Sequence, residues 1–100
     1  MKLVYYPKAE SDLEDILAYY ESKVQGLANY FLDEVEFIEA ILSKNPKAFQ
    51  FRYKNMRAVP LNRFPYMVYY KIVGDTVFII LIISTHQSPI HHKKEIRERK

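Results

Sequence analysis

The sequence predicts an α+β fold in which a helical hairpin covers one face of a mostly antiparallel sheet of about four strands. In the first half of the chain, apolar residues recur every three or four positions, as in amphipathic helices. After Pro46 the period changes to two, as in strands. Residues 77–83 are apolar throughout, which indicates a strand covered on both faces. A chain in which helices precede the strands favours a fold with the helices in one layer and the sheet in another.

The chain opens with a short strand, at residues 2–6, that Pro7 ends. We expect this strand at an edge of the sheet. Residues 8–23 form the first predicted helix, and its apolar stripe is Ala9, Leu13, Ile16, Leu17 and Tyr20. Either Pro7 in the first turn or a capping box of Ser11 and Glu14 starts it. Gly26 is a natural stop.

The second predicted helix spans residues 27–44. Its apolar stripe is Leu27, Phe31, Val35, Ile38 and Leu42. Asn45-Pro46 ends it, because the residue before a proline avoids the helical region. The link between the two helices is short, so we expect an antiparallel αα-hairpin.

The second half of the chain supplies the other strands. Residues 51–54 and 56–61 alternate around a tight turn expected at Asn55-Met56, and Pro60 belongs at an edge or bulge because it cannot donate to a ladder. A β-hairpin over residues 63–83 turns at Gly74-Asp75. Residues 1–90 are therefore expected to form one domain. The basic tail at residues 91–100 is expected to be a short helix or a frayed, solvated end.

Composition narrows the class of protein. One hundred residues make one small domain, and the absence of Cys excludes disulfides and Cys-ligated metals and fits a cytoplasmic location. The apolar run at 77–83 is far shorter than the ~20 residues of a membrane-spanning helix. His91-His92 lacks a third ligand, so we expect neither a metal nor a cofactor.

Charge is divided between the halves of the chain. Residues 1–50 carry five Lys and nine acids, whereas residues 51–100 carry ten Lys or Arg and three acids. This division predicts a basic face suited to an acidic or polyanionic partner. A solvated surface would show the same pattern.

Four segments, in order, resemble the RelE/ParE superfamily of small bacterial toxins over roughly residues 5–89. The first is residues 7–16, with Ala9 followed three positions later by Asp12-Leu13. The second is Asn45-Pro46. The third is residues 57–70, an Arg-containing strand that leads into Arg63-Phe64-Pro65-Tyr66. The fourth is the strand at 77–83 followed by His86.

The resemblance implies the toxin of a type II toxin–antitoxin system, of the kind that serves plasmid stabilisation. It implies a cognate antitoxin whose C-terminal segment wraps the toxin through apolar and acidic side chains. The implied target is DNA gyrase in the ParE branch, or messenger RNA on the ribosome in the RelE ribonuclease branch. Edge strands and exposed apolar residues are compatible with a homodimer or a toxin–antitoxin hetero-oligomer.

Two positions favour the ParE branch. The resemblance places Met67 and Gln87 where the ribonuclease branch has Arg, and the C-terminal Tyr of that branch is missing. Met and Gln cannot neutralise a developing phosphate charge. Whether the chain is an enzyme stays open, because Arg57, Arg63, His86 and His91 remain catalytic candidates for RNA cleavage. A non-toxic, degenerate relative is a third hypothesis.

The residues expected to contact a target or an antitoxin are Arg52, Lys54, Arg57, Arg63, Tyr66 and His86. Several have structural alternatives. For Arg63, an ion pair with Asp12 or Glu14 of the first helix is favoured over a contact with a target. Among Tyr66, Tyr69 and Tyr70, at least one is expected in the core. Arg57, on an edge strand, is expected to face solvent or a partner.

Overall fold

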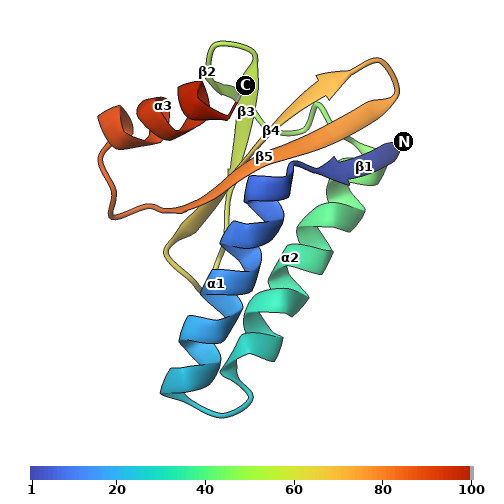
Figure 1. Cartoon of the computed structure of the whole chain (residues 1–100). Helices are drawn as coiled ribbons and strands as arrows, with labels where there is room; N and C mark the ends of the chain where they lie inside the picture. The colour runs from blue at the N-terminus through green and yellow to red at the C-terminus, as the bar shows by residue number, and fades with distance from the viewer. Residues whose placement is uncertain (100) are drawn as a thin grey trace.

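The computed structural model describes residues 1–99. Its elements, in order, are β1 (Lys2–Tyr5), α1 (Pro7–Lys23), α2 (Leu27–Lys44), β2 (Phe51–Tyr53), β3 (Met56–Pro60), β4 (Tyr66–Val73), β5 (Thr76–Ser84) and α3 (Pro89–Glu98). One sheet has the order β1-β5-β4-β3-β2, and only the edge pair β1–β5 is parallel. The αα-hairpin packs on one face of this sheet, and α3 packs on the other face (Figure 1). The α+β prediction is confirmed, with five strands rather than four.

The helix ends follow local chemistry. α1 begins at Pro7 without a side-chain cap, so the proline start is correct and the Ser11 capping box does not form. Gly26 has φ +86°, a left-handed conformation that glycine adopts without strain, and its N–H donates to the Glu21 carboxylate. α2 ends at Lys44, immediately before Asn45-Pro46, as predicted.

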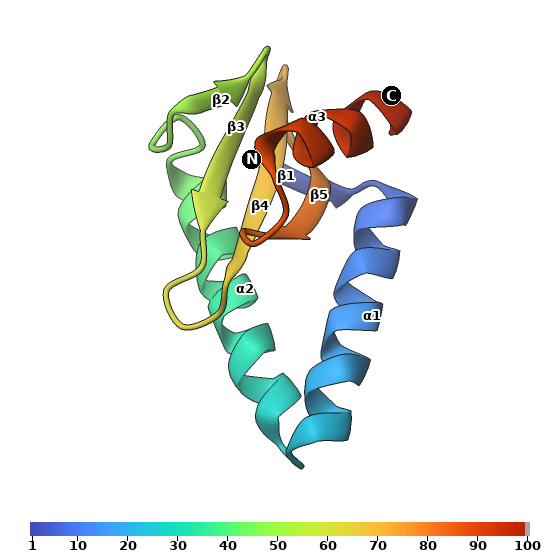
Figure 2. The same cartoon turned by 90° about the vertical axis from the view of Figure 1, so that its left-hand side faces the viewer.

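The two helices diverge from their connecting turn toward the sheet (Figure 2). An aromatic cluster fills this space. Tyr20 of α1 stacks on Phe31 of α2 with ring centroids 5.7 Å apart, and Phe64 contacts both rings edge-on. Tyr66 lies edge-on to Phe31 at 5.4 Å. Edge-to-face pairs of this kind add about 0.5–1.5 kcal/mol beyond the burial of their area.

β5 is covered on both faces, as its continuous apolar sequence predicts. Val77, Ile79 and Ile82 pack under the αα-hairpin, whereas Ile80, Leu81 and Ile83 belong to the cluster under α3. Two successive residues share a face because the register with β4 shifts beside Ile80, between the pairs Tyr70–Ile79 and Tyr69–Leu81. The extra residue is a β-bulge.

The C-terminal segment forms the short helix α3, one of the two alternatives expected for it, rather than a frayed, solvated end. Ser88 caps α3 by accepting the His91 N–H, and Pro89 occupies the first turn. His92 and Ile96 are buried against the sheet. The domain boundary expected at residue 90 therefore falls inside α3. The buried pair is a histidine and an isoleucine among charged residues, so no apolar stripe marks this helix in the sequence.

A second correction concerns the turn between β2 and β3. It lies at Lys54-Asn55, one position earlier than expected, and Lys54 has φ +52°. Pro60 is the last residue of β3, beyond the stretch that pairs with β2, so the predicted edge position is confirmed.

Candidate functional site

A cavity of about 160 Å³ opens where β2, β4 and the start of α3 meet. Arg52, Tyr53, Met67, Gln87, His92 and Lys93 contribute to its walls, and we call it the α3 cavity. It is smaller than the ~300–1,000 Å³ typical of small-molecule sites. A cavity of this volume suits a single side chain or chemical group better than an enclosed cofactor.

His92 forms the polar floor of the α3 cavity and is 6% exposed. Its Nε2 lies 3.0 Å from the Ser84 carbonyl oxygen, and its Nδ1 lies 2.9 Å from the Tyr69 hydroxyl. A carbonyl only accepts, so these partners assign the proton to Nε2, and Nδ1 accepts from Tyr69. Both ring nitrogens are thereby used in holding α3 on the sheet.

Positive side chains surround the mouth of the cavity. The Lys54 and Lys93 ammonium groups lie 5.4 and 5.5 Å from the centre of the Tyr53 ring. The pKa of Tyr53 is lowered, mainly by a hydrogen bond from Arg97 and further by Lys54. Burial raises the pKa of Tyr69, and a hydrogen bond from Arg52 opposes that rise. The site favours negative charge.

Met67 and Gln87, the two positions that argue against ribonuclease chemistry, both line this cavity. Met67 is buried and packs in the cluster under α3. Gln87 is exposed in the connection between β5 and α3. The side chains projecting here from β4 and from this connection are thus uncharged.

Arg57 is a structural residue. Its guanidinium donates to the carbonyl oxygens of Phe49, at 2.7 Å, and Lys47, and it lies 4.0 Å from the centre of the Phe51 ring. It thus fixes the segment that leads into β2. β3 lies between β4 and β2, so the edge-strand position expected for Arg57 is wrong, whereas a contact of its half-buried side chain with a partner stays a prediction.

Arg63 does not pair with Asp12 or Glu14. Its backbone N–H donates to both Glu34 carboxylate oxygens, at 2.9 and 3.1 Å, and within residues 1–99 no carboxylate forms an ion pair with its exposed guanidinium. Asp12 instead binds Arg99, after α3, and accepts the Ile82 N–H at 3.1 Å. Arg99 also donates to the Ile80 carbonyl at 3.1 Å, so this pair satisfies the bulged edge of β5.

The remaining candidates do not line the α3 cavity. Tyr66 packs in the aromatic cluster, and burial raises its pKa. Tyr69 and Tyr70 are buried as well, which confirms a core role among these tyrosines. His86 lies in an exposed turn, and His91 lies on α3 outside the cavity walls. Arg57, Arg63, His86 and His91 therefore do not form one constellation.

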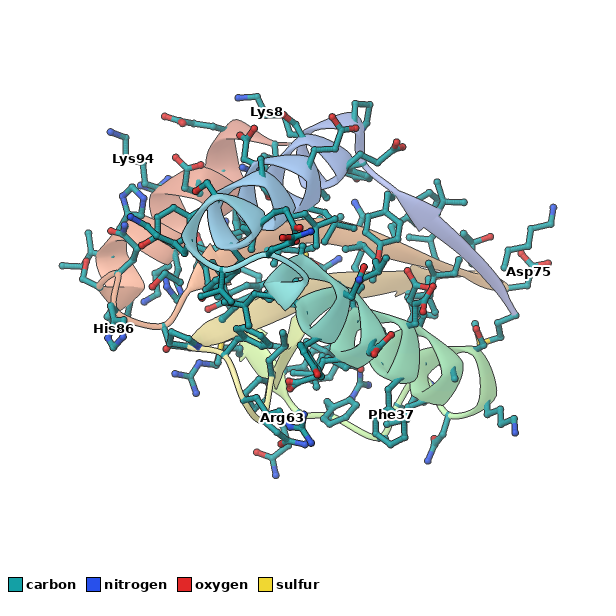
Figure 3. The ribbon with its side chains drawn as sticks, turned by 90° about the horizontal axis from the view of Figure 1, so that it is seen from below. Lys8, Phe37, Arg63, Asp75, His86 and Lys94 are labelled. Carbon is teal, nitrogen blue, oxygen red and sulfur yellow. The ribbon has the colours of Figure 1, made fainter. Side chains whose placement is uncertain are left out.

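A second surface lies beside α2. Two hollows, of about 200 and 380 Å³, share Glu34, Phe37 and Asn62, and we call them together the α2 groove. Tyr30 is 56% and Phe37 is 63% exposed in its wall. Phe37 and Arg63 project from the same side of the molecule, and Lys94 from another (Figure 3). The sequence reasoning missed this groove, although Tyr30 and Phe37 stand outside the buried stripe of α2.

Within residues 1–99, no group of three His, Asp or Glu side chains is arranged to hold a metal ion. None of the helices in this part of the chain has the length and hydropathy needed to span a bilayer.

The comparisons with known proteins agree with this architecture. The model of the family described as "ParE toxin of type II toxin-antitoxin system, parDE" matches residues 3–89. A chain of the chromosomal ParDE system from P. aeruginosa has a TM-score of 0.74 and 22% identity, covering 84% of this chain and 95% of that one. The isolated E. coli RelE toxin has a TM-score of 0.55 and 15% identity, covering 97% of both chains. At these identities the structural likeness concerns the fold. No curated relative matches the sequence.

Proposed function

The chain belongs to the ParE toxin family of type II toxin–antitoxin systems, and on this premise we propose that it acts in the cytoplasm as an inhibitor of DNA gyrase and is neutralised by a cognate antitoxin. One observation carries the choice of target. Met67 and Gln87, which by the family resemblance stand where the ribonuclease branch has Arg, both line the α3 cavity.

RNA cleavage by attack of a 2′-hydroxyl needs a base, an acid and cations placed at the phosphorane. His92 is the imidazole that lines the α3 cavity, and both of its nitrogens already bind Tyr69 and Ser84. The other catalytic candidates are dispersed. These features support inhibition by binding rather than by RNA cleavage.

The antitoxin, in this proposal, covers the α2 groove with apolar side chains. Phe37 and Tyr30 offer the exposed apolar area that protein partners bury. Pro60, which lines the groove at the end of β3, has no N–H and makes this edge a poor template for an added strand. A helical antitoxin segment therefore fits the groove better than an extended one. A toxin–antitoxin hetero-oligomer follows from this assignment.

Induction of the chain in a bacterium without its antitoxin tests the target. We expect growth arrest with loss of supercoiling in a reporter plasmid, and we expect toe-printing of translated messages to show no new 5′ ends. New message ends with unchanged supercoiling would replace this proposal with the ribonuclease alternative. Harmless accumulation of folded protein would favour a degenerate relative.

A further inference from the structure

Four positive side chains gather beside the α3 cavity, three of them around Tyr53 and Arg52 next to Tyr69. Arg52 and Lys54 come from the β2–β3 hairpin, and Lys93 and Arg97 come from α3. Both lysine ammonium groups lie within 5.5 Å of the centre of the Tyr53 ring. We call Arg52, Lys54, Lys93 and Arg97 the cationic face.

The cationic face lacks internal neutralisation. Within residues 1–99, the ion pairs are Arg99 with Asp12 and Arg99 with Glu95, so no described carboxylate pairs with any of the four. Of the two acidic residues inside α3, Glu95 binds Arg99, and within the described chain Glu98 forms no ion pair with the cationic face. Like charges gathered without counter-charges destabilise a folded chain, which indicates that a ligand supplies the missing negative charge.

Lys54 is an independent sign of a functional constraint. It is the only non-glycine residue among residues 1–99 with positive φ, at +52°. Such a turn position suits Gly or Asn, because the left-handed conformation costs a residue with a Cβ atom free energy. A cation kept at a strained position beside three others fits a binding role better than a turn-forming role.

We propose that the cationic face binds the phosphodiester backbone of a nucleic acid. Large exposed apolar side chains, which a protein partner would bury, line the α2 groove at Tyr30 and Phe37. Within the described part of α3, Ile90 is the one large exposed apolar side chain. The exposed Phe51 of β2 lies beside Arg57 and is not in the wall of the α3 cavity. A surface rich in Lys and Arg with little apolar area suits a polyanion, which is held mainly by neutralised charge.

The choice of duplex DNA as the nucleic acid rests on the proposed function, because gyrase acts on duplex DNA. The binding itself is measurable without gyrase. The probes are a labelled duplex DNA, a single-stranded RNA of equal length and an oligoglutamate peptide of equal charge, each titrated with the full chain by fluorescence anisotropy.

The test variant is K54G/K93Q/R97Q, and the control is K8Q/K23Q/K44Q, which removes the same charge from α1 and α2. We expect the test variant to bind duplex DNA at least about tenfold more weakly at ~0.1 M salt. We also expect its slope of log affinity against log salt to be shallower by about 2–3, because each lost phosphate contact removes about 0.9. The control should change affinity less than about twofold. Circular dichroism should show both variants folded.

Equal weakening of both variants, or no binding by the unmodified chain at ~50 mM salt, would overturn the proposal. Tighter binding of oligoglutamate than of DNA, lost in the test variant, would overturn it in favour of an acidic protein segment. Tighter binding of RNA than of duplex DNA would retain the phosphodiester site and contradict the gyrase target. Tighter binding of duplex DNA than of RNA or oligoglutamate supports both the phosphodiester site and the gyrase target.

Discussion

The two faces of the sheet are held by different chemistry. Under the αα-hairpin, the buried cluster contains thirteen residues, all apolar or aromatic. Under α3, the cluster contains seven. The smaller face is completed by polar links, namely His92 between Tyr69 and Ser84, and Arg99 between Asp12 and the Ile80 carbonyl.

This difference assigns separate tasks to the two faces. The hairpin face buries the larger apolar cluster, and each buried large side chain contributes about 1.5–3 kcal/mol to stability. The α3 face depends on hydrogen bonds that leave cationic side chains at its rim. We therefore expect changes on the hairpin face to affect stability most, and changes at the rim of the α3 face to affect binding most.

The largest effect should come from Phe31→Ala. Phe31 is fully buried, so its removal should lower the free energy of unfolding by about 3–5 kcal/mol. Phe37→Ala makes the same chemical change at an exposed residue of α2 and should alter stability by less than about 0.5 kcal/mol while weakening antitoxin binding. Urea titration and antitoxin titration measure the two effects. Equal destabilisation by both variants would contradict the contrast between core and groove.

Asp12→Asn should be the most damaging single change to the links of the α3 face. The side chain of Arg99 is 7% exposed, and without the Asp12 carboxylate its charge is left incompletely paired. We expect a loss of about 2–3 kcal/mol, below the ~3–5 of a fully buried pair, because Asp12 is 18% exposed. The control is Asp15→Asn on the exposed side of α1. A thermal midpoint unchanged by Asp12→Asn would show that α3 is held without this pair.

Tyr69→Phe tests the hydrogen bond to His92. It leaves Nδ1 of His92 without its donor in a buried site and should lower stability by about 1–2 kcal/mol. Tyr53→Phe removes the same hydroxyl group at the rim and should be close to neutral. Hydrogen exchange of the α3 amides would locate the loss. Exchange that accelerates equally throughout the hairpin face would contradict a local role.

Alkaline pH should weaken the hairpin face more than the α3 face, because four of its tyrosines have a raised pKa, against Tyr69 on the α3 face. Burial, then the hydrogen bond to Glu39, raises the pKa of Tyr5, and burial raises those of Tyr20, Tyr66 and Tyr70. These phenols stay protonated in the folded chain, so their contribution is complete below the unfolded pKa of ~10 and is lost as pH rises above it. Stability should fall by up to about 1.4 kcal/mol per pH unit for each group. In Tyr5→Phe the fall should be shallower, whereas in the exposed Tyr19→Phe it should be unchanged.

The smallest expected effect has the opposite sign. Lys54→Gly relieves the left-handed strain at φ +52° and should raise stability by about 0.5 kcal/mol after the entropy of glycine is counted. Lys54→Ala removes the same charge and keeps the strain, so it should give no gain. Both should weaken nucleic-acid binding alike. If Lys54→Gly and Lys54→Ala differ in nucleic-acid binding, the effect comes from the conformation of the turn, and a charge-based role for Lys54 is contradicted.

The sequence predicts the hairpin face well because its helices bury one stripe and its central strand is apolar on both faces. Phe31, Val35, Ile38 and Leu42 are buried as their spacing predicts. The α3 face depends on contacts between distant residues that no local period encodes. Asp12 meets Arg99, and Tyr69 meets His92, only after the sheet has formed. For the same reason Arg57 was expected at a binding surface, although it holds the Phe49 carbonyl.

The most direct test of the central proposal is the supercoiling of relaxed plasmid by purified gyrase, titrated with the full chain. We predict dose-dependent loss of supercoiling, reversal by the antitoxin, and a weaker effect of K54G/K93Q/R97Q than of K8Q/K23Q/K44Q. Undiminished supercoiling at concentrations of the chain that arrest growth in cells would contradict the assignment of gyrase as the target.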